Sequence, residues 1–77
     1  MAEASLYDRI VAASGLTPVI APYTIRRLLL RANVLPPEKV TLAQYRELLP
    51  GLLAELRVYL GREEHEAAAA ALRELAR

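Results

Sequence analysis

The chain has 77 residues, no cysteine and a formal net charge of +1 at pH 7. These values exclude a disulfide framework, a thiolate metal site and a strongly basic nucleic-acid-binding tail, and they predict one domain over residues 1–77. Because so short a chain buries only about 60% of its unfolded surface, and because 55% of its residues are apolar, we expect it to self-associate, with a homodimer favoured.

A first helix is predicted over residues 6–14. Ser5 and Asp8 have the spacing of an N-terminal cap, in which a hydroxyl is followed three residues later by an acid. Gly15 can adopt the left-handed conformation that ends helices. The segment should therefore form a short helix whose apolar side chains share one face.

A second helix is predicted over residues 22–33, after a single turn at residues 17–21. Pro22 lies where it would disrupt a helix that began at Thr17, so the main helix should begin near Pro22 itself. Asn33 can end a helix in the left-handed conformation, and the two prolines that follow cannot continue one. The inner face of this helix should consist of Ile25, Leu28, Leu29 and Ala32.

A third helix is predicted over residues 42–60, with a kink at Pro50. Thr41 and Gln44 have the pattern of a capping box, in which each side chain bonds the other residue's backbone N–H. Pro50 falls on the polar side of the helix, where a bend disturbs the core least. Apolar residues recur at the period of a helix with one buried face, so we expect this helix to lie in the middle of the fold. They are Leu42, Tyr45, Leu49, Leu52, Leu56 and Tyr59.

A fourth helix is predicted over residues 62–76, after Gly61 ends the third. Glu63 and Glu64 lie in its first turn, where the helix dipole favours acidic side chains. Its inner face is thin and rich in alanine, which allows a neighbouring helix to approach closely. The sequence shows no strand-like alternation and therefore predicts an all-α fold, a small four-helix bundle.

The second helix carries an apolar strip on the side opposite its inner face. Arginines flank this strip, whereas a surface helix normally keeps that side polar. Because Tyr and Arg are enriched at interface hot spots, the strip predicts a site for a protein partner, either a second copy of the chain or a protein with an acidic surface. The candidate partner-binding residues are Tyr23, Arg26, Arg27, Leu30, Arg31 and Val34.

Two structural interpretations of the same strip stay open. The first helix or the Pro36–Pro37 loop could cover it, or the helix could be solvated, with arginines that keep it soluble. The leading functional hypothesis is a non-enzymatic protein–protein interaction or oligomerisation module, such as a self-associating adaptor.

The alternative function is a small DNA-binding protein whose arginines contact phosphates, together with Arg9 and Lys39. Residues 7–24 can be aligned with a helix-turn-helix motif, but its second helix would contain two prolines. Prolines disrupt the regular helix that this motif places in the major groove of DNA. The charge surplus is also small, +2 for residues 1–39 and −1 for the rest of the chain. We therefore place nucleic-acid binding second.

Two short stretches resemble histone-fold proteins. Ala21-Pro22 followed by Ile25–Leu29 (IRRLL) resembles their first helix, and residues 61–64 (GREE) resemble their last loop. The resemblance covers about a dozen positions and implies DNA binding through the same arginines. The expected central helix departs from the family, because it is far shorter than a histone fold requires and contains a proline.

The sequence predicts no enzyme, no cofactor and no metal ion. His65 is the only histidine, and neither a second histidine nor a cysteine is present to complete a metal site. The longest uncharged run, residues 10–25, is short and interrupted by glycine and proline, so we expect no membrane span. No secretory leader opens the chain, and we therefore expect a cytoplasmic protein.

Overall fold

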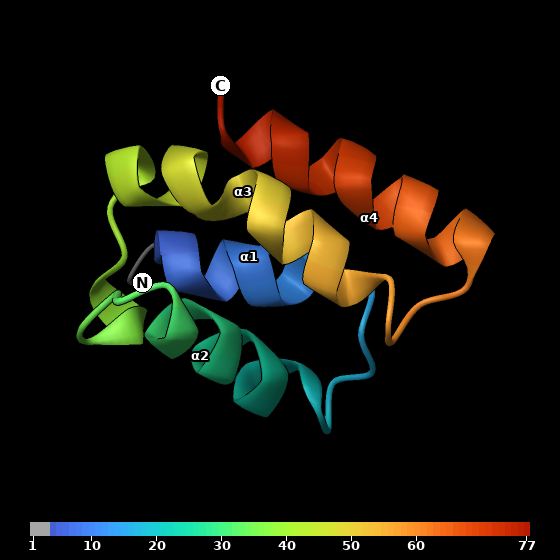
Figure 1. The fold of residues 1–77 in the computed structure, drawn as a ribbon, viewed down its shortest axis with the longest axis horizontal. Helices are drawn as coiled ribbons and strands as arrows, with labels where there is room; N and C mark the ends of the chain where they lie inside the picture. Colours follow the sequence, from blue (N-terminus) through green and yellow to red (C-terminus); the bar gives the residue numbers. More distant parts are fainter. Residues whose placement is uncertain (1–3) are drawn as a thin grey trace.

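The computed structural model describes residues 4–77, which form four α-helices and one turn of 3₁₀-helix and contain no strand (Figure 1). The elements are α1 (Leu6–Ala13), α2 (Ala21–Arg31), η1 (Pro37–Lys39), α3 (Leu42–Leu56) and α4 (Arg62–Leu75). The prediction of an all-α, four-helix fold is therefore confirmed. In this part of the chain, no helix is both long enough and apolar enough to cross a membrane.

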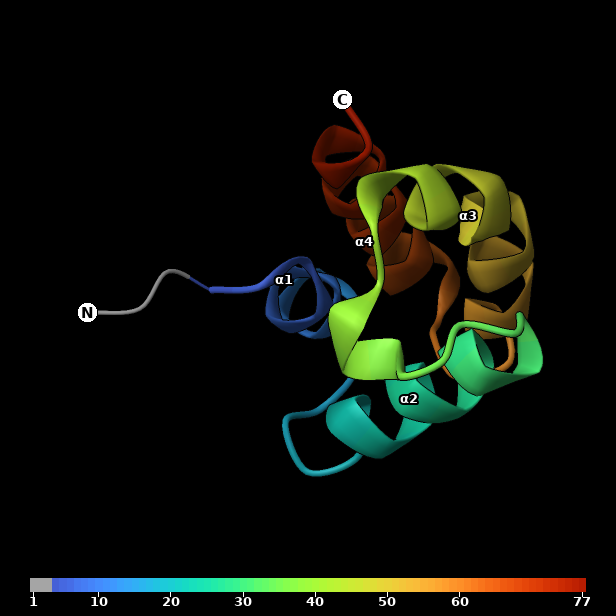
Figure 2. The same cartoon turned by 90° about the vertical axis from the view of Figure 1, so that its left-hand side faces the viewer.

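The four helices alternate in direction around a common core. α1 packs against α2 and α4, and α3 packs against the same two helices from the other side. Figure 2 views this ring nearly end-on, with η1 beside α1 and α2. The expectation that α3 lies in the middle is wrong, because α1 closes the ring opposite it and side chains of all four helices meet in the core.

The N-terminal caps form as the sequence predicts. The Ser5 side chain accepts from the Asp8 N–H at 3.1 Å, and the Asp8 carboxylate accepts from the Ser5 N–H at 3.3 Å. Thr41 and Gln44 make the same reciprocal pair at the start of α3, at 3.1 and 2.9 Å. Each capping box satisfies N–H groups that a helix start leaves without partners, so local sequence fixes both starts.

Gly15 ends α1 and also lets the end of α1 approach α4. Its φ of 78° is the predicted left-handed conformation, in which a side chain would be strained. A Cβ atom at this position would lie only 3.3 Å from the Ala68 Cβ. The small residues of α4 therefore allow close packing, as the alanine-rich sequence predicts.

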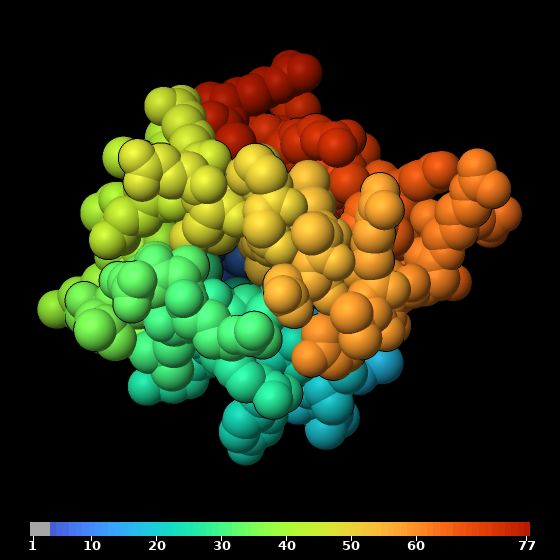
Figure 3. Space-filling model, viewed as in Figure 1, coloured from blue at the N-terminus to red at the C-terminus, as the bar shows by residue number. Residues whose placement is uncertain are grey.

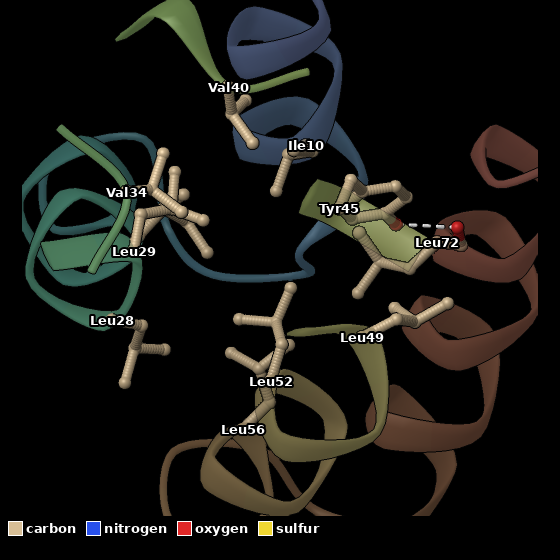
Figure 4. Close-up of a cluster of buried hydrophobic side chains, with 11 residues drawn as sticks. Ile10, Leu28, Leu29, Val34, Val40, Tyr45, Leu49, Leu52, Leu56 and Leu72 are labelled. Atoms are coloured by element: carbon tan, nitrogen blue, oxygen red, sulfur yellow. Dashed lines mark hydrogen bonds between the residues drawn. The ribbon is translucent and has the colours of Figure 1, made fainter. Parts of the chain in front are cut away.

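The core is built around the inner face of α3 (Figure 4). Tyr45, Leu49, Leu52 and Leu56 are buried, which confirms the predicted apolar face over this span. They meet buried side chains from the other three helices and from the segment between α2 and α3. Those side chains are Ile10, Ile25, Leu28, Leu29, Val34, Val40 and Leu72.

α3 ends at Leu56, four residues before the predicted end at residue 60. The N–H groups of Arg57 and the two residues after it donate three residues back, as in a tightened turn. The Leu53 carbonyl, which Arg57 would bond in a continuing helix, instead lies 2.7 Å from His65 Nε2. Since a carbonyl oxygen only accepts, His65 donates and satisfies the end of α3. Tyr59 consequently leaves the buried face and is 43% exposed.

The C-terminal end of α4 is satisfied by side chains of α3. The Tyr45 hydroxyl donates to the Leu72 carbonyl at 2.5 Å, and Arg46 Nε donates to the Ala76 carbonyl at 2.6 Å. Leu72 lies in the last turn of α4 and Ala76 is its C-cap residue, and carbonyls at these positions lack partners within the helix. Burial raises the pKa of Tyr45 to about 12, because it disfavours the charged phenolate. Hydrogen bonds as well as apolar contacts therefore join α3 and α4.

α3 continues through Pro50, which lies inside the helix and is exposed. The ribbon changes direction midway along this helix (Figure 1). Proline removes one backbone donor and crowds the preceding turn. Because Pro50 lies on the outer side, this irregularity falls away from the buried leucines, as the sequence predicts.

Candidate interaction surface on the second helix

The outer face of α2 exposes two of the apolar side chains that the sequence assigns to the strip. Tyr23 is 77% exposed and Leu30 is 38% exposed. Both lie on the side of the helix opposite its buried face, so no part of residues 4–77 covers Tyr23. Ala32, which the sequence places on the inner face, is exposed at the C-terminal end of the helix. The buried face consists of Ala21, Thr24, Ile25, Leu28 and Leu29.

Val34 does not belong to this strip, because its side chain is only 3% exposed and lies in the core (Figure 4). Asn33 adopts a φ of 65°, the predicted left-handed conformation, and Val34 N–H then donates to the Leu29 carbonyl at 3.0 Å. In this C-terminal motif, the residue after the left-handed position packs back against the helix. The prediction for Val34 is wrong because helical periodicity does not extend beyond Asn33.

Two of the three arginines beside the strip are paired with acids of this same chain. Arg26 binds Glu38 of η1, and Arg31 Nη1 lies 3.9 Å from a carboxylate oxygen of Glu55 in α3. Arg27 has no salt-bridge partner within residues 4–77. Exposed pairs of this kind contribute at most about 1 kcal/mol each. They nevertheless reduce the positive charge that α2 offers to an anionic partner.

Two apolar residues just before α2 extend the exposed surface, and the sequence interpretation missed them. Val19 is 79% exposed and Ile20 is 43% exposed, in the predicted single turn that leads into the helix. Ile20 is the N-cap of α2 and lies three residues before Tyr23, so the two side chains are neighbours on the first turn. The apolar run between Pro18 and Pro22 is the signal that could have identified them, since no helical face exists there to bury it.

A second exposed apolar pair lies at the same end of the molecule. The α1–α2 loop meets the α3–α4 loop there (Figure 1), and a Cβ atom on Gly15 would be 3.5 Å from Leu60 Cδ1. In the α3–α4 loop, Val58 is 79% exposed and Tyr59 is 43% exposed. The sequence alone does not bring these two loops together, because their meeting depends on how the helices pack.

A groove of about 330 Å³ lies between α2 and α3, on the side of α2 that carries Arg31. Figure 3 shows this hollow between the two helices. A Cβ atom on Gly51 would have no neighbour within 4 Å, so the groove has room for a side chain of a partner. The apolar and small residues that line it are Leu28, Ala32, Leu48, Gly51 and Leu52.

Two serines, a histidine and a tyrosine are engaged in structural contacts. Ser5 caps α1, and Ser14 is buried with its Oγ donating to the Val11 carbonyl at 2.8 Å. His65 and Tyr45 each donate to a backbone carbonyl. Within residues 4–77, no group of three histidine or acidic side chains could hold a metal ion. Among these features, the exposed face of α2 is the one that matches a predicted site.

No protein-family model, curated protein or solved structure matches this chain.

Proposed function

We propose that this chain is a non-enzymatic protein–protein interaction module that self-associates through the outer face of α2. The observation that carries the proposal is Tyr23, an aromatic side chain that is 77% exposed in the first turn of the helix. Leu30 lies two turns later on the same side and is also exposed. Ile20, exposed beside Tyr23, makes the apolar surface contiguous at the start of the helix, and such surfaces commonly mark interaction sites.

Burial of these side chains would supply the affinity. Full burial of a Tyr removes about 150–250 Å² from water, and full burial of a Leu side chain stabilises by about 1.5–3 kcal/mol. Ile20 adds a third apolar anchor beside Tyr23. A dimer with two-fold symmetry uses every anchor twice. We therefore favour a homodimer in which two α2 helices pack against each other.

The arginines would contribute more to the specificity of the interaction than to its affinity. Arg26 and Arg31 already pair with carboxylates of their own chain, so an acidic partner must compete with those carboxylates. Arg27 can meet an acid of a partner without competition from residues 4–77. Charges at the rim of an interface affect specificity and association rate more than affinity. A protein with an acidic surface is the second partner that this face suits.

DNA binding by the same arginines, with Arg9 of α1 and Lys39 of η1, is the alternative. The two ion pairs of α2 lower the charge available for phosphates. Binding to duplex DNA at increasing salt tests this alternative: micromolar affinity that falls steeply with salt would establish it, and no binding at low salt would remove it. A cytoplasmic location stays a prediction from the sequence.

Leu30→Glu tests the proposed interface. We expect the wild-type protein to sediment as a dimer and the variant as a monomer with unchanged helicity, because the new carboxylate would be buried against an apolar partner. Leu42→Glu is the matched control, since Leu42 is 36% exposed and lies at the start of α3. A monomeric wild-type protein, or equal dissociation of both variants, would contradict the proposal.

A further inference from the structure

A second groove lies between α3 and α4 and is larger than the groove beside α2. It encloses about 560 Å³. Its middle part is lined by Pro50, Leu53 and Ala54. On a helical wheel these residues lie on the side of α3 away from α2, so this groove is separate from the proposed α2 interface.

Three arginines line the rest of this groove, together with Leu49 and His65. They are Arg46, Arg57 and Arg73. No carboxylate lines the groove, and none of these arginines has a salt-bridge partner within residues 4–77. On α2, two of three arginines are paired with acids. Within the described chain, no ion pair therefore neutralises the three arginines of the α3–α4 groove.

The packing of α4 on α3 holds part of this lining in place. Arg46 Nε donates to the Ala76 carbonyl at 2.6 Å, which orients the guanidinium and leaves its two terminal nitrogens outside that bond. His65 Nε2 donates to the Leu53 carbonyl at 2.7 Å, which fixes the ring. Donors that are already oriented bind an anion with a smaller loss of conformational freedom.

The charges lie towards the two ends of the groove, with the apolar lining between them. Arg46 lies in the first turns of α3, whereas Arg57 directly follows the helix. At 1.5 Å per residue, the two backbones are separated by about 16 Å along the axis. Arg73 comes from the last turn of α4 and lies towards the Arg46 end of the groove, because Arg46 bonds the carbonyl of Ala76, three residues after Arg73.

We propose that the α3–α4 groove binds an acidic amphipathic segment of a partner protein, with apolar anchors in its middle and carboxylates towards both ends. Grooves between helices accept such segments through their apolar side chains. Guanidinium groups bind carboxylates through two parallel hydrogen bonds, which favours acids at the positions of Arg46 and Arg57. The groove has arginines towards both ends and an apolar lining between them. The ligand should therefore have carboxylates towards both ends and apolar side chains between them.

A nucleic acid fits this lining less well. No aromatic side chain lines the groove to stack on a base. The arginines stand at its ends, whereas a nucleic-acid backbone offers phosphates at regular short intervals. The observations therefore favour a protein segment.

The test uses a synthetic helical peptide with glutamates at both ends and leucines in the middle, labelled for fluorescence anisotropy at low salt. The double variant Arg57→Gln, Arg73→Gln removes two charges but keeps the Arg46 cap and replaces each arginine with a good helix former. The control Arg9→Gln, Lys39→Gln removes the same charge from α1 and η1. We expect the peptide to bind about tenfold more weakly to the groove variant, and equally well to the control and the wild-type protein.

Three results would overturn the proposal. The peptide could fail to bind the wild-type protein, both double variants could weaken it equally, or a peptide with glutamine at the acidic positions could bind as tightly. Displacement of the peptide by a lower concentration of duplex DNA would reassign the groove to nucleic acid. None of these results depends on whether the α2 face self-associates, because Leu30→Glu tests that face separately.

Discussion

The two sides of α3 are joined to their neighbours in different ways. On the α4 side, Tyr45, Arg46 and His65 make hydrogen bonds to backbone carbonyls across the contact. On the α2 side, the polar contact found within residues 4–77 is the Arg31–Glu55 pair at 3.9 Å, beside an open groove. Hydrogen bonds to unpartnered helix-end carbonyls fix orientation, whereas a long exposed ion pair contributes little.

This difference matches the two proposed modes of binding. The α3–α4 groove has a fixed lining with unpaired arginines, so it suits a ligand recognised by the positions of its charges. α2 is held to α3 by apolar contacts and offers apolar side chains outward, so it suits a partner that buries surface. Three substitutions can break or sharpen this comparison, and they follow in order of expected effect.

Val34→Ala should have the largest effect, because it weakens the anchor that holds the end of α2 on the core. Loss of two buried methyl groups should lower the free energy of unfolding by about 2 kcal/mol. Val19→Ala is the matched control, since Val19 is 79% exposed and its truncation should change stability by less than about 0.5 kcal/mol. Urea unfolding of both variants measures the difference in their free energies of unfolding. Equal losses of stability would mean that Val34 is exposed on the strip and not buried in the core.

Tyr45→Phe should break the hydrogen-bonded side of α3. It leaves the Leu72 carbonyl without the hydroxyl that bonds it at 2.5 Å, so unfolding should become easier by about 1–2 kcal/mol. His65→Gln provides a comparison at the other end of the same contact, where the side chain is only partly buried. If Tyr45→Phe lowered the free energy of unfolding less than His65→Gln does, the importance assigned to the buried hydroxyl would be contradicted.

The same substitution carries a prediction about pH. Burial raises the pKa of Tyr45 from 10.0 to about 12, so the folded protein keeps a proton that the unfolded chain releases. This contribution to stability is fully present below about pH 10 and falls as the pH rises towards about 12. The stability gap between wild-type protein and Tyr45→Phe should therefore narrow across this interval in urea titrations. A constant gap would show that Tyr45 titrates alike in both states.

Gly51→Ala should have the smallest effect and the opposite sign. A Cβ atom there meets no atom within 4 Å, and alanine favours a helix over glycine by about 0.5–1 kcal/mol, so thermal unfolding should occur at a higher temperature. Gly15→Ala is the contrasting variant and should destabilise the protein. The φ of Gly15 is 78°, and the added Cβ atom would lie only 3.3 Å from the Ala68 Cβ. Destabilisation by Gly51→Ala would mean that the groove between α2 and α3 is not open.

The elements that sequence reasoning predicts correctly are the ones that local chemistry determines. The capping boxes at Ser5 and Thr41 form between residues three apart, and the left-handed ends at Gly15 and Asn33 depend on single residues. The buried face of α3 follows from helical periodicity. None of these features needs knowledge of the rest of the chain.

The errors arise where distant parts of the chain decide the outcome. α3 ends early where His65, from the next helix, takes the carbonyl of Leu53. Val34 turns inward because the chain leaves the helical path at Asn33. The α3–α4 groove combines Arg46 with Arg73, which are far apart in sequence and meet only through packing. For the candidate site, periodicity identified Tyr23 and Leu30 but could not reveal which arginines pair with acids.

The alternating direction of the helices also determines how the molecule presents itself when it is tethered. The start of α1 and the finish of α4 lie at one pole (Figure 1), and the loops that carry Val19 and Val58 lie at the other. A support or fluorescent protein attached through Arg77 would therefore leave those hydrophobic tips pointing into open solution. Attachment through Arg77 is thus suitable for presenting these loops, because the exposed Val19 and Val58 would be the first part of the molecule that an approaching partner contacts.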